Sequence, residues 1–166
     1  MVKKLVKFEF KIAEALIDHF IRVFIMLKDA IEIIPSKEWK ISNEDNLIPA
    51  RQAIHMLECA VFYCSTETVE SFPWGQMFGG DYESMSAESL PSQETVLEKS
   101  EEIKKILIDW LKSKNNSEFL APEQDFSWTG KTILARTLYL LRHFQHHQGV
   151  LHAELHRRGI TKPGWQ

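Results

Sequence analysis

The residues best suited to chemistry are five of the chain's seven histidines, which lie between His143 and His156. A segment from about Lys131 to Arg158 carries apolar residues at helical spacing and is followed by a glycine, where helices commonly end. On such a helix His143 and His147 stand one turn apart beside the apolar stripe, whereas His146 points away from it. Two imidazoles four residues apart can direct their Nε2 atoms at one ion. This spacing is therefore typical of a metal site.

The same spacing has a second explanation. His152 and His156 repeat it, and histidines at the edge of a core often do no more than satisfy hydrogen bonds. His156 also lies in the last turn beside two arginines, where cations interact favourably with the helix dipole. We expect neither of these residues nor His146 to be a ligand. Two histidines make only half a site, so this helix alone leaves metal binding and a structural role both open.

Composition and charge limit what the whole chain can be. Its 166 residues suit one domain spanning 1–166, and its 44% hydrophobic content is enough for a packed core. The net charge of -3 comes without a long basic run, so nucleic acid is not expected as a partner. Charged residues interrupt the apolar stretches near the start, so no signal peptide or membrane span is expected. Cys59 and Cys64 are five apart on one predicted helix and point to different sides. A disulfide is therefore not expected, and a reducing cytosol is the expected compartment.

Four amphipathic segments predict four helices. Apolar residues recur every three or four positions over about Val2–Ile34, Pro49–Val69, Gln93–Lys114 and Lys131–Arg158. The second segment has two apolar faces, as expected inside a bundle, and its His55 should be buried or half-buried and need a polar partner. No strand-like alternation of useful length occurs between them. We therefore predict an all-α, single-domain four-helix bundle.

Two connections in this bundle are unusually long, Ser71 to Pro91 and Glu118 to Thr129. Loops of this length in a compact domain are usually functional or cross over between helices. The first holds Trp74, Phe78 and Tyr82, which we expect to provide the apolar lining of a pocket beside the histidines. The last residue of the second connection is a candidate cap for the fourth helix.

A family resemblance rests on two stretches of the sequence. A histidine early in the second helix (IPARQAIHMLECAVFYC) and the pattern HxxHHxG followed by LxxxLxxxG (RHFQHHQGVLHAELHRRGI) resemble the DinB-like superfamily, of DinB/YfiT type. The resemblance covers nearly the whole chain. It implies a four-helix bundle with crossover connections, often a homodimer, that binds a divalent metal through three histidines. The matching positions are His55, His143 and His147. Zinc or nickel is the expected ion, since imidazole suits both.

The same resemblance implies small-molecule chemistry. Relatives include metal-dependent S-transferases that use the thiols bacillithiol or mycothiol, and mycothiol-dependent maleylpyruvate isomerases. It implies a metal that acts as a Lewis acid on a bound thiol or water, in a thiol S-transferase or a hydrolase of a small substrate. The alternative is a non-catalytic protein that binds a metal or ligand in a stress response.

Three further residues bear on this choice. Cys59 lies four residues after His55 on the same side of the helix, so its sulfur could fill an open metal position. A buried cysteine is more commonly a small core residue. Glu58 and Glu154 are candidates for contacts around the ligands, although solvated helix charges are the commoner case. No side chain can be assigned as a catalytic acid or base.

The first predicted helix bears on assembly. Ile21, Phe24 and Ile25 widen its apolar stripe beyond a single face. Together with the resemblance, this leads us to expect a twofold homodimer that buries part of this helix or another face of the bundle. The alternative is that the same residues are covered inside the bundle.

Overall fold

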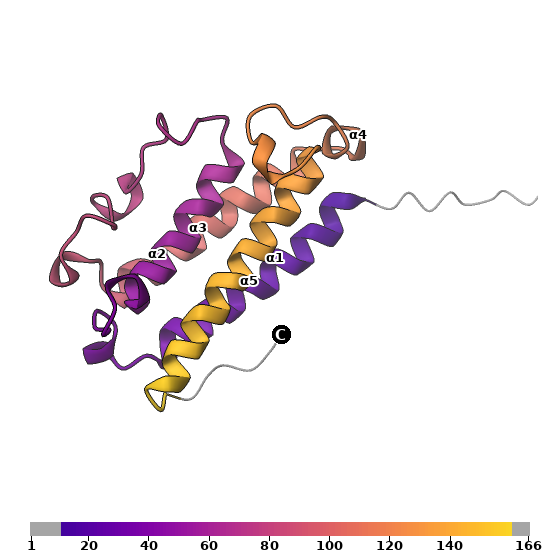
Figure 1. Cartoon of the computed structure of the whole chain (residues 1–166). Coiled ribbons are helices and arrows are strands. Elements are labelled where there is room, and N and C mark those ends of the chain that lie inside the picture. The colour runs from indigo at the N-terminus through magenta and orange to yellow at the C-terminus, as the bar shows by residue number, and fades with distance from the viewer. Residues whose placement is uncertain (1–10, 161–166) are drawn as a thin grey trace, which may run out of the picture.

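The computed structural model describes residues 11–160, which form four long helices and one short one (Figure 1). The predicted start of the first helix, residues 2–10, lies outside the described residues. Within residues 11–160 there is no strand, which confirms the all-α class. The helices are α1 (Ile12–Ile33), α2 (Pro49–Cys64), α3 (Gln93–Lys112), α4 (Asn116–Phe119) and α5 (Ile133–Arg157). Single 3-10 turns lie in the connections at Ser36–Glu38, Asp45–Leu47, Gln76–Phe78, Ala87–Ser89 and Ser127–Thr129.

The four long helices form the predicted bundle, in which each packs against two neighbours. Helix α1 packs on α3 and α5, and α2 packs on the same two helices, so α1 and α2 lie mainly across a diagonal. Both the connection 34–48 and the connection 113–132 therefore cross the bundle. The connection 65–92 returns the chain to the end where α2 begins, so α2 and α3 run in the same direction (Figure 1).

Trp39 marks the end of the bundle at which α2 and α3 both begin. Its backbone oxygen accepts a hydrogen bond from the N–H of Ala50 at 3.1 Å, and its indole donates to the backbone oxygen of Pro91 at 2.9 Å. The indole is buried, whereas Ile41 in the same connection is exposed. Trp39 thus fixes the connection 34–48, the first crossover, against the starts of α2 and α3.

Helix α2 ends at Cys64, five residues before the predicted end. Ser65 is extended, and its hydroxyl donates to the backbone oxygen of Phe62 at 2.8 Å. Thr68 and Ser71 form further local hydrogen bonds just beyond it. Serine and threonine hydroxyls compete in this way for backbone groups that a helix would otherwise use, and this explains the early end.

The N-terminal cap of α5 also differs from the expectation. Thr132, not Thr129, caps this helix, because its hydroxyl oxygen accepts the N–H of Ala135 at 3.1 Å. The hydroxyl of Thr129 instead donates to the backbone oxygen of Phe126 at 2.7 Å. The other end matches the prediction, since Gly159 follows the helix with a φ of 73°, which favours glycine.

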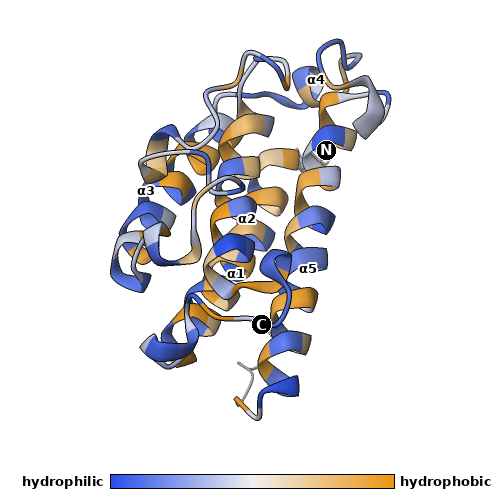
Figure 2. Ribbon diagram, turned by 60° about the vertical axis from the view of Figure 1, so that its left-hand side comes forward, coloured by the Kyte–Doolittle hydropathy of each residue, from blue (hydrophilic) through white to orange (hydrophobic). Residues whose placement is uncertain are grey.

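One apolar face of each long helix fills the core. Figure 2 shows hydrophobic and hydrophilic residues alternating along the helices, as expected when each helix buries one side. Near the middle, the rings of Phe24 and Phe144 lie 5.4 Å apart, and both are buried. Phe144 directly follows His143 in the sequence, so this packing helps to fix the rotation of α5 and the direction in which its histidines point.

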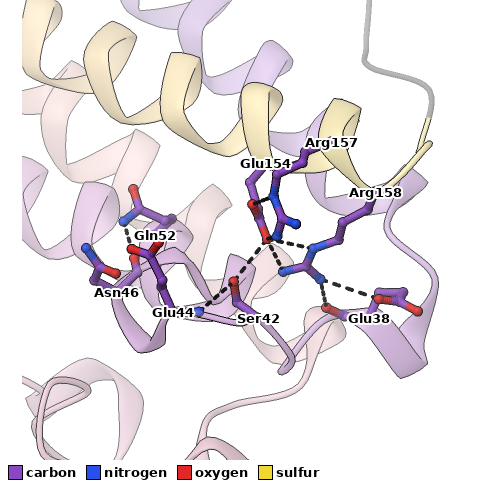
Figure 3. Close-up of polar contacts among 8 residues, drawn as sticks. All are labelled: Glu38, Ser42, Glu44, Asn46, Gln52, Glu154, Arg157 and Arg158. Carbon is purple, nitrogen blue, oxygen red and sulfur yellow. Dashed lines mark hydrogen bonds and ion pairs between the residues drawn. The ribbon is translucent and has the colours of Figure 1, made fainter.

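A buried carboxylate joins the end of α5 to the first crossover (Figure 3). Glu154 is only 3% exposed, and it accepts hydrogen bonds from Ser42 at 3.0 Å and from Arg157 and Arg158 at 2.8 Å each. Arg158 also donates to the backbone oxygen of Glu38 at 3.1 Å. The expectation that Glu154 is a solvated helix charge is therefore wrong, because the crossover folds over it.

Candidate metal centre

Helices α2 and α5 bring three histidines together near the middle of the bundle. The Nε2 atoms of His55 and His143 lie 3.1 Å apart, although the residues are 88 positions apart in the sequence. The ring of His147, one turn further along α5, is centred 4.4 Å from that of His55 and 4.5 Å from that of His143. The three predicted ligands thus form one cluster, and that they bind metal remains a prediction.

A cysteine also belongs to this cluster. The donor atoms of His55, Cys59 and His143 all lie within 4.8 Å of one another, so these three residues form a group that could hold a metal ion. The Cys59 sulfur is 3.8 Å from Nε2 of His55. The sequence spacing allowed Cys59 to approach the histidines, but a role as a small core residue was the more expected one. In the structure Cys59 is both buried and beside the histidines.

Two of the donor separations are close to those that one ion would impose. With metal–nitrogen bonds of ~2.1 Å and a metal–sulfur bond of ~2.3 Å, tetrahedral angles put two nitrogens roughly 3.4 Å apart, and a nitrogen and a sulfur roughly 3.6 Å apart. The observed distances are 3.1 Å between the nitrogens of His55 and His143, and 3.8 Å between the nitrogen of His55 and the sulfur of Cys59. The sulfur also lies 3.9 Å from Nδ1 of His55, so it does not lie along the lone pair of Nε2, although imidazole with thiolate is a donor set that zinc prefers.

Burial keeps the histidines neutral at pH 7. It lowers the pKa of His55, His143 and His147 to about 4 each, and the proximity of the other histidines lowers each pKa further. A neutral imidazole offers a lone pair, so these rings could bind metal without first losing a proton. Burial, followed by the charges of Glu58 and Glu83, raises the pKa of Cys59 to about 12, so its thiol keeps its proton at neutral pH.

Two polar side chains orient these rings. The hydroxyl of Tyr82 lies 2.6 Å from Nδ1 of His55, and Oε1 of Gln52 lies 2.9 Å from Nδ1 of His147. The amide of Gln52 in turn donates to the backbone oxygen of Asn46 at 2.6 Å (Figure 3). Partners of this kind commonly orient metal-binding histidines. Sequence reasoning assigned Tyr82 only an apolar role and did not select Gln52, although Gln52 lies one turn before His55.

Two cavities adjoin His55. One of ≈ 270 Å³ is lined by Val69, Trp74 and the segment 81–83, and one of ≈ 390 Å³ by the segment 45–46, by Tyr82 and by residues of the cluster. Trp74 and Tyr82 thus border the site as expected, but Phe78 is buried in the core and lines neither cavity. A larger cavity of ≈ 590 Å³, between the start of α1 and the segment 112–118, contains no histidine. Size alone therefore does not identify the functional cavity.

Two buried ionisable side chains of α2, Arg51 and Glu58, hold the connection 65–92 against the site. Arg51 donates to the backbone oxygens of Tyr82 and Met85, and Glu58 accepts the N–H of Gly75 at 2.6 Å. Gly75 has a φ of 80°, and a Cβ there would lie 2.1 Å from the Gly80 backbone, so only glycine fits. Burial raises the pKa of Glu58 to about 7, an effect that the Gly75 hydrogen bond partly offsets. Glu58 is therefore not the solvated helix charge that the sequence suggested.

Of the histidines of α5, only His143 belongs to the donor group, and the predicted ligand His147 stands outside it, as do His146, His152 and His156. His146 is exposed, and its ring meets that of His147 edge-on at 5.0 Å. His156 is also exposed, in the last turn of the helix, and His152 is half-buried. That none of the three is a ligand remains a prediction.

Comparison of the chain with known protein families and with curated proteins finds no match. Of the helices in residues 11–160, none combines the length and the apolar character that crossing a membrane requires. The cluster formed by His55, Cys59, His143 and His147 is therefore the feature of the structure that bears on function.

Proposed function

We propose that this chain is a metal-dependent enzyme that binds one divalent ion, zinc or nickel, through His55, His143 and His147. It uses the ion in the transfer of a low-molecular-weight thiol or the hydrolysis of a small substrate. The observation that carries the proposal is the 3.1 Å separation between the Nε2 atoms of His55 and His143, beside two cavities. Three protein ligands with an open position are the pattern of catalytic rather than structural zinc sites.

The chain's own residues supply binding and orientation. The bound ion supplies Lewis acidity, which lowers the pKa of a coordinated thiol or water and makes it a nucleophile at neutral pH. Tyr82 and Gln52 hold the imidazoles of His55 and His147 by their Nδ1 atoms, which leaves the Nε2 atoms for the ion. Trp74 and Tyr82 offer apolar surface to a small substrate. This chemistry requires no side-chain base, and the sequence offered none.

The resemblance to the DinB-like superfamily supports the same proposal. The crossover bundle matches the fold that the resemblance implies, and the three histidines it points to lie together. Its thiol S-transferases make a small thiol the first substrate class to test. The resemblance also supports a homodimer, for which Ile21 and Ile25 on α1 are candidates because they are 38% and 40% exposed.

A second candidate function is non-catalytic metal or ligand binding, as in a stress response. The position of Cys59 favours it, because the sulfur lies 3.8 Å from Nε2 of His55. If Cys59 and three histidines all bound the ion, four protein ligands would close the site. The two candidates therefore differ in whether an exogenous thiol can reach the metal.

The proposal is tested with the purified protein loaded with cobalt, whose visible spectrum reports its ligands. We expect about one bound ion per chain, and a spectral change when cysteamine or 2-mercaptoethanol is added. Turnover assays of the zinc and nickel forms with several thiols and electrophiles then identify the reaction. If no thiol alters the cobalt spectrum, thiol transfer is excluded, and hydrolysis through bound water or non-catalytic binding remains. A protein that binds no metal at all would refute both candidates.

A further inference from the structure

The hydroxyl group of Tyr82 bridges His55 and Glu83. Its oxygen lies 2.6 Å from Nδ1 of His55, and it donates to Oε1 of Glu83 at 3.2 Å. A hydroxyl has one proton, and a carboxylate can only accept. With that proton directed to Glu83, the hydroxyl oxygen accepts from His55, which must then carry its own proton on Nδ1.

We propose that Tyr82, supported by Glu83, is a positioning residue that fixes the proton of His55 on Nδ1 and so reserves Nε2 for the metal. This inference rests on the proposed function, in which Nε2 of His55 binds a metal ion. In a neutral imidazole one nitrogen carries the proton and the other the lone pair. The opposite tautomer would place a proton on the atom that faces Nε2 of His143 at 3.1 Å, where the ion would bind.

The backbone around Tyr82 is built to hold this hydroxyl in place. Its side chain is 6% exposed, and its backbone oxygen accepts a hydrogen bond from the guanidinium of Arg51. Arg51 also pairs with Asp45 at 3.2 Å and donates to the backbone oxygen of Met85 at 2.6 Å. Arg51 lies one turn before His55 on α2, so the same helix carries both the ligand and the anchor of its partner. A tyrosine that only filled space would not need its hydroxyl between a histidine and a carboxylate.

The test compares Tyr82→Phe with Tyr63→Phe, which removes a hydroxyl from another buried tyrosine of the same protein. The Tyr63 hydroxyl accepts from the indole of Trp128 at 3.3 Å, and the structure gives it no hydrogen bond to a histidine. A third variant, Glu83→Ala, removes the carboxylate that accepts the hydrogen bond of the Tyr82 hydroxyl. Glu83 is exposed, so this change leaves the core unaltered. The readouts are the ¹⁵N NMR signals of the histidines in the metal-free protein and the affinity for zinc alone.

We expect His55 to show the Nδ1–H tautomer in the wild type and in Tyr63→Phe, and a loss of that preference in Tyr82→Phe and, to a smaller extent, in Glu83→Ala. Zinc affinity should fall roughly 10- to 100-fold in Tyr82→Phe and remain unchanged in Tyr63→Phe. If Tyr82→Phe retains both the tautomer and the affinity, the inference is wrong, whereas zinc binding by the wild type would still support the proposed function. A wild type that binds neither zinc nor nickel would refute the proposed function, whereas the NMR signals of the metal-free protein decide separately whether Tyr82 fixes the tautomer of His55.

Discussion

The sulfur of Cys59 lies 3.8 Å from Nε2 of His55, one turn away on the same helix. A thiol therefore stands beside His55 and His143, with its pKa raised to about 12 by burial and then by the nearby carboxylates. Whether this thiol becomes a ligand decides between an open and a closed site. An open site would admit a substrate to the ion, whereas a closed site would not.

Replacing Cys59 with alanine separates the two candidate functions. If the site is catalytic, Cys59→Ala still binds about one ion, and added thiol still perturbs the cobalt spectrum, because the three histidines suffice. The measurement is a titration of cobalt-loaded wild type and variant with cysteamine. Cys64→Ala is the matched control, since Cys64 is a free cysteine on the same helix that lies outside the donor group. Loss of bound metal in Cys59→Ala alone would support the closed, non-catalytic site.

The histidines of α5 should differ sharply in their effect on metal content. We expect His143→Ala and His147→Ala to reduce bound metal from about one ion per chain to near zero, and His55→Ala to do the same from α2. His146→Ala should retain the ion, because His146 is exposed beside the cluster. Metal analysis of proteins purified side by side gives the result. Loss of metal from His146→Ala would show that the ligand set has been misassigned.

Stability in acid should depend on Glu154. Hydrogen bonds from Arg157, and then from Arg158 and Ser42, lower the pKa of Glu154 from an ordinary 4.5 to about 2, despite its burial. The ionised carboxylate therefore stabilises the fold above about pH 4.5, and this contribution is lost as the pH falls from about 4.5 to about 2. It amounts to about 1–3 kcal/mol at neutral pH, because Arg157 is half-exposed and solvent screens its charge.

Urea unfolding of metal-free wild type and Glu154→Gln at several pH values measures this contribution. The difference in unfolding free energy should be largest near neutral pH and should shrink below pH 4.5. The difference is the relevant quantity, because the three half-buried histidines destabilise both proteins as they take up protons below about pH 6.5. Glu102→Gln, which removes an exposed carboxylate paired with Lys99, should change stability by less than about 0.5 kcal/mol. A difference that did not vary with pH would contradict the assignment.

A homodimer should depend on the exposed face of α1. Ile25 is 40% exposed on α1, and Ile106 is 37% exposed on α3, so Ile25→Glu and Ile106→Glu are matched substitutions. We expect the wild type to sediment as a dimer at micromolar concentration and Ile25→Glu to shift toward monomer. The Ile106→Glu protein should remain dimeric. A monomeric wild type would rule out the dimer, and equal behaviour of the two variants would place the interface elsewhere.

The features that the sequence predicted well are those that depend on local geometry. Apolar spacing located the four long helices, because helical periodicity is set by residues three and four apart. The same rule placed His143 and His147 on one flank of α5 and Cys59 one turn from His55. Helix ends were predicted less well. The end of α2 and the cap of α5 depend on hydroxyl contacts at residues 65 and 132, which apolar periodicity does not reveal.

By itself, then, the sequence determined an all-α bundle and the pair His143 and His147, and family resemblance alone added His55 as their partner. Only the tertiary structure decided that Nε2 of His55 meets Nε2 of His143, because these atoms belong to helices whose separation and rotation depend on the whole core. It likewise decided that Tyr82, expected only as apolar lining, forms hydrogen bonds with His55 and Glu83 at the site. The position of that hydroxyl depends on how a long loop folds back onto α2, and loop conformation is fixed by distant contacts rather than by local periodicity.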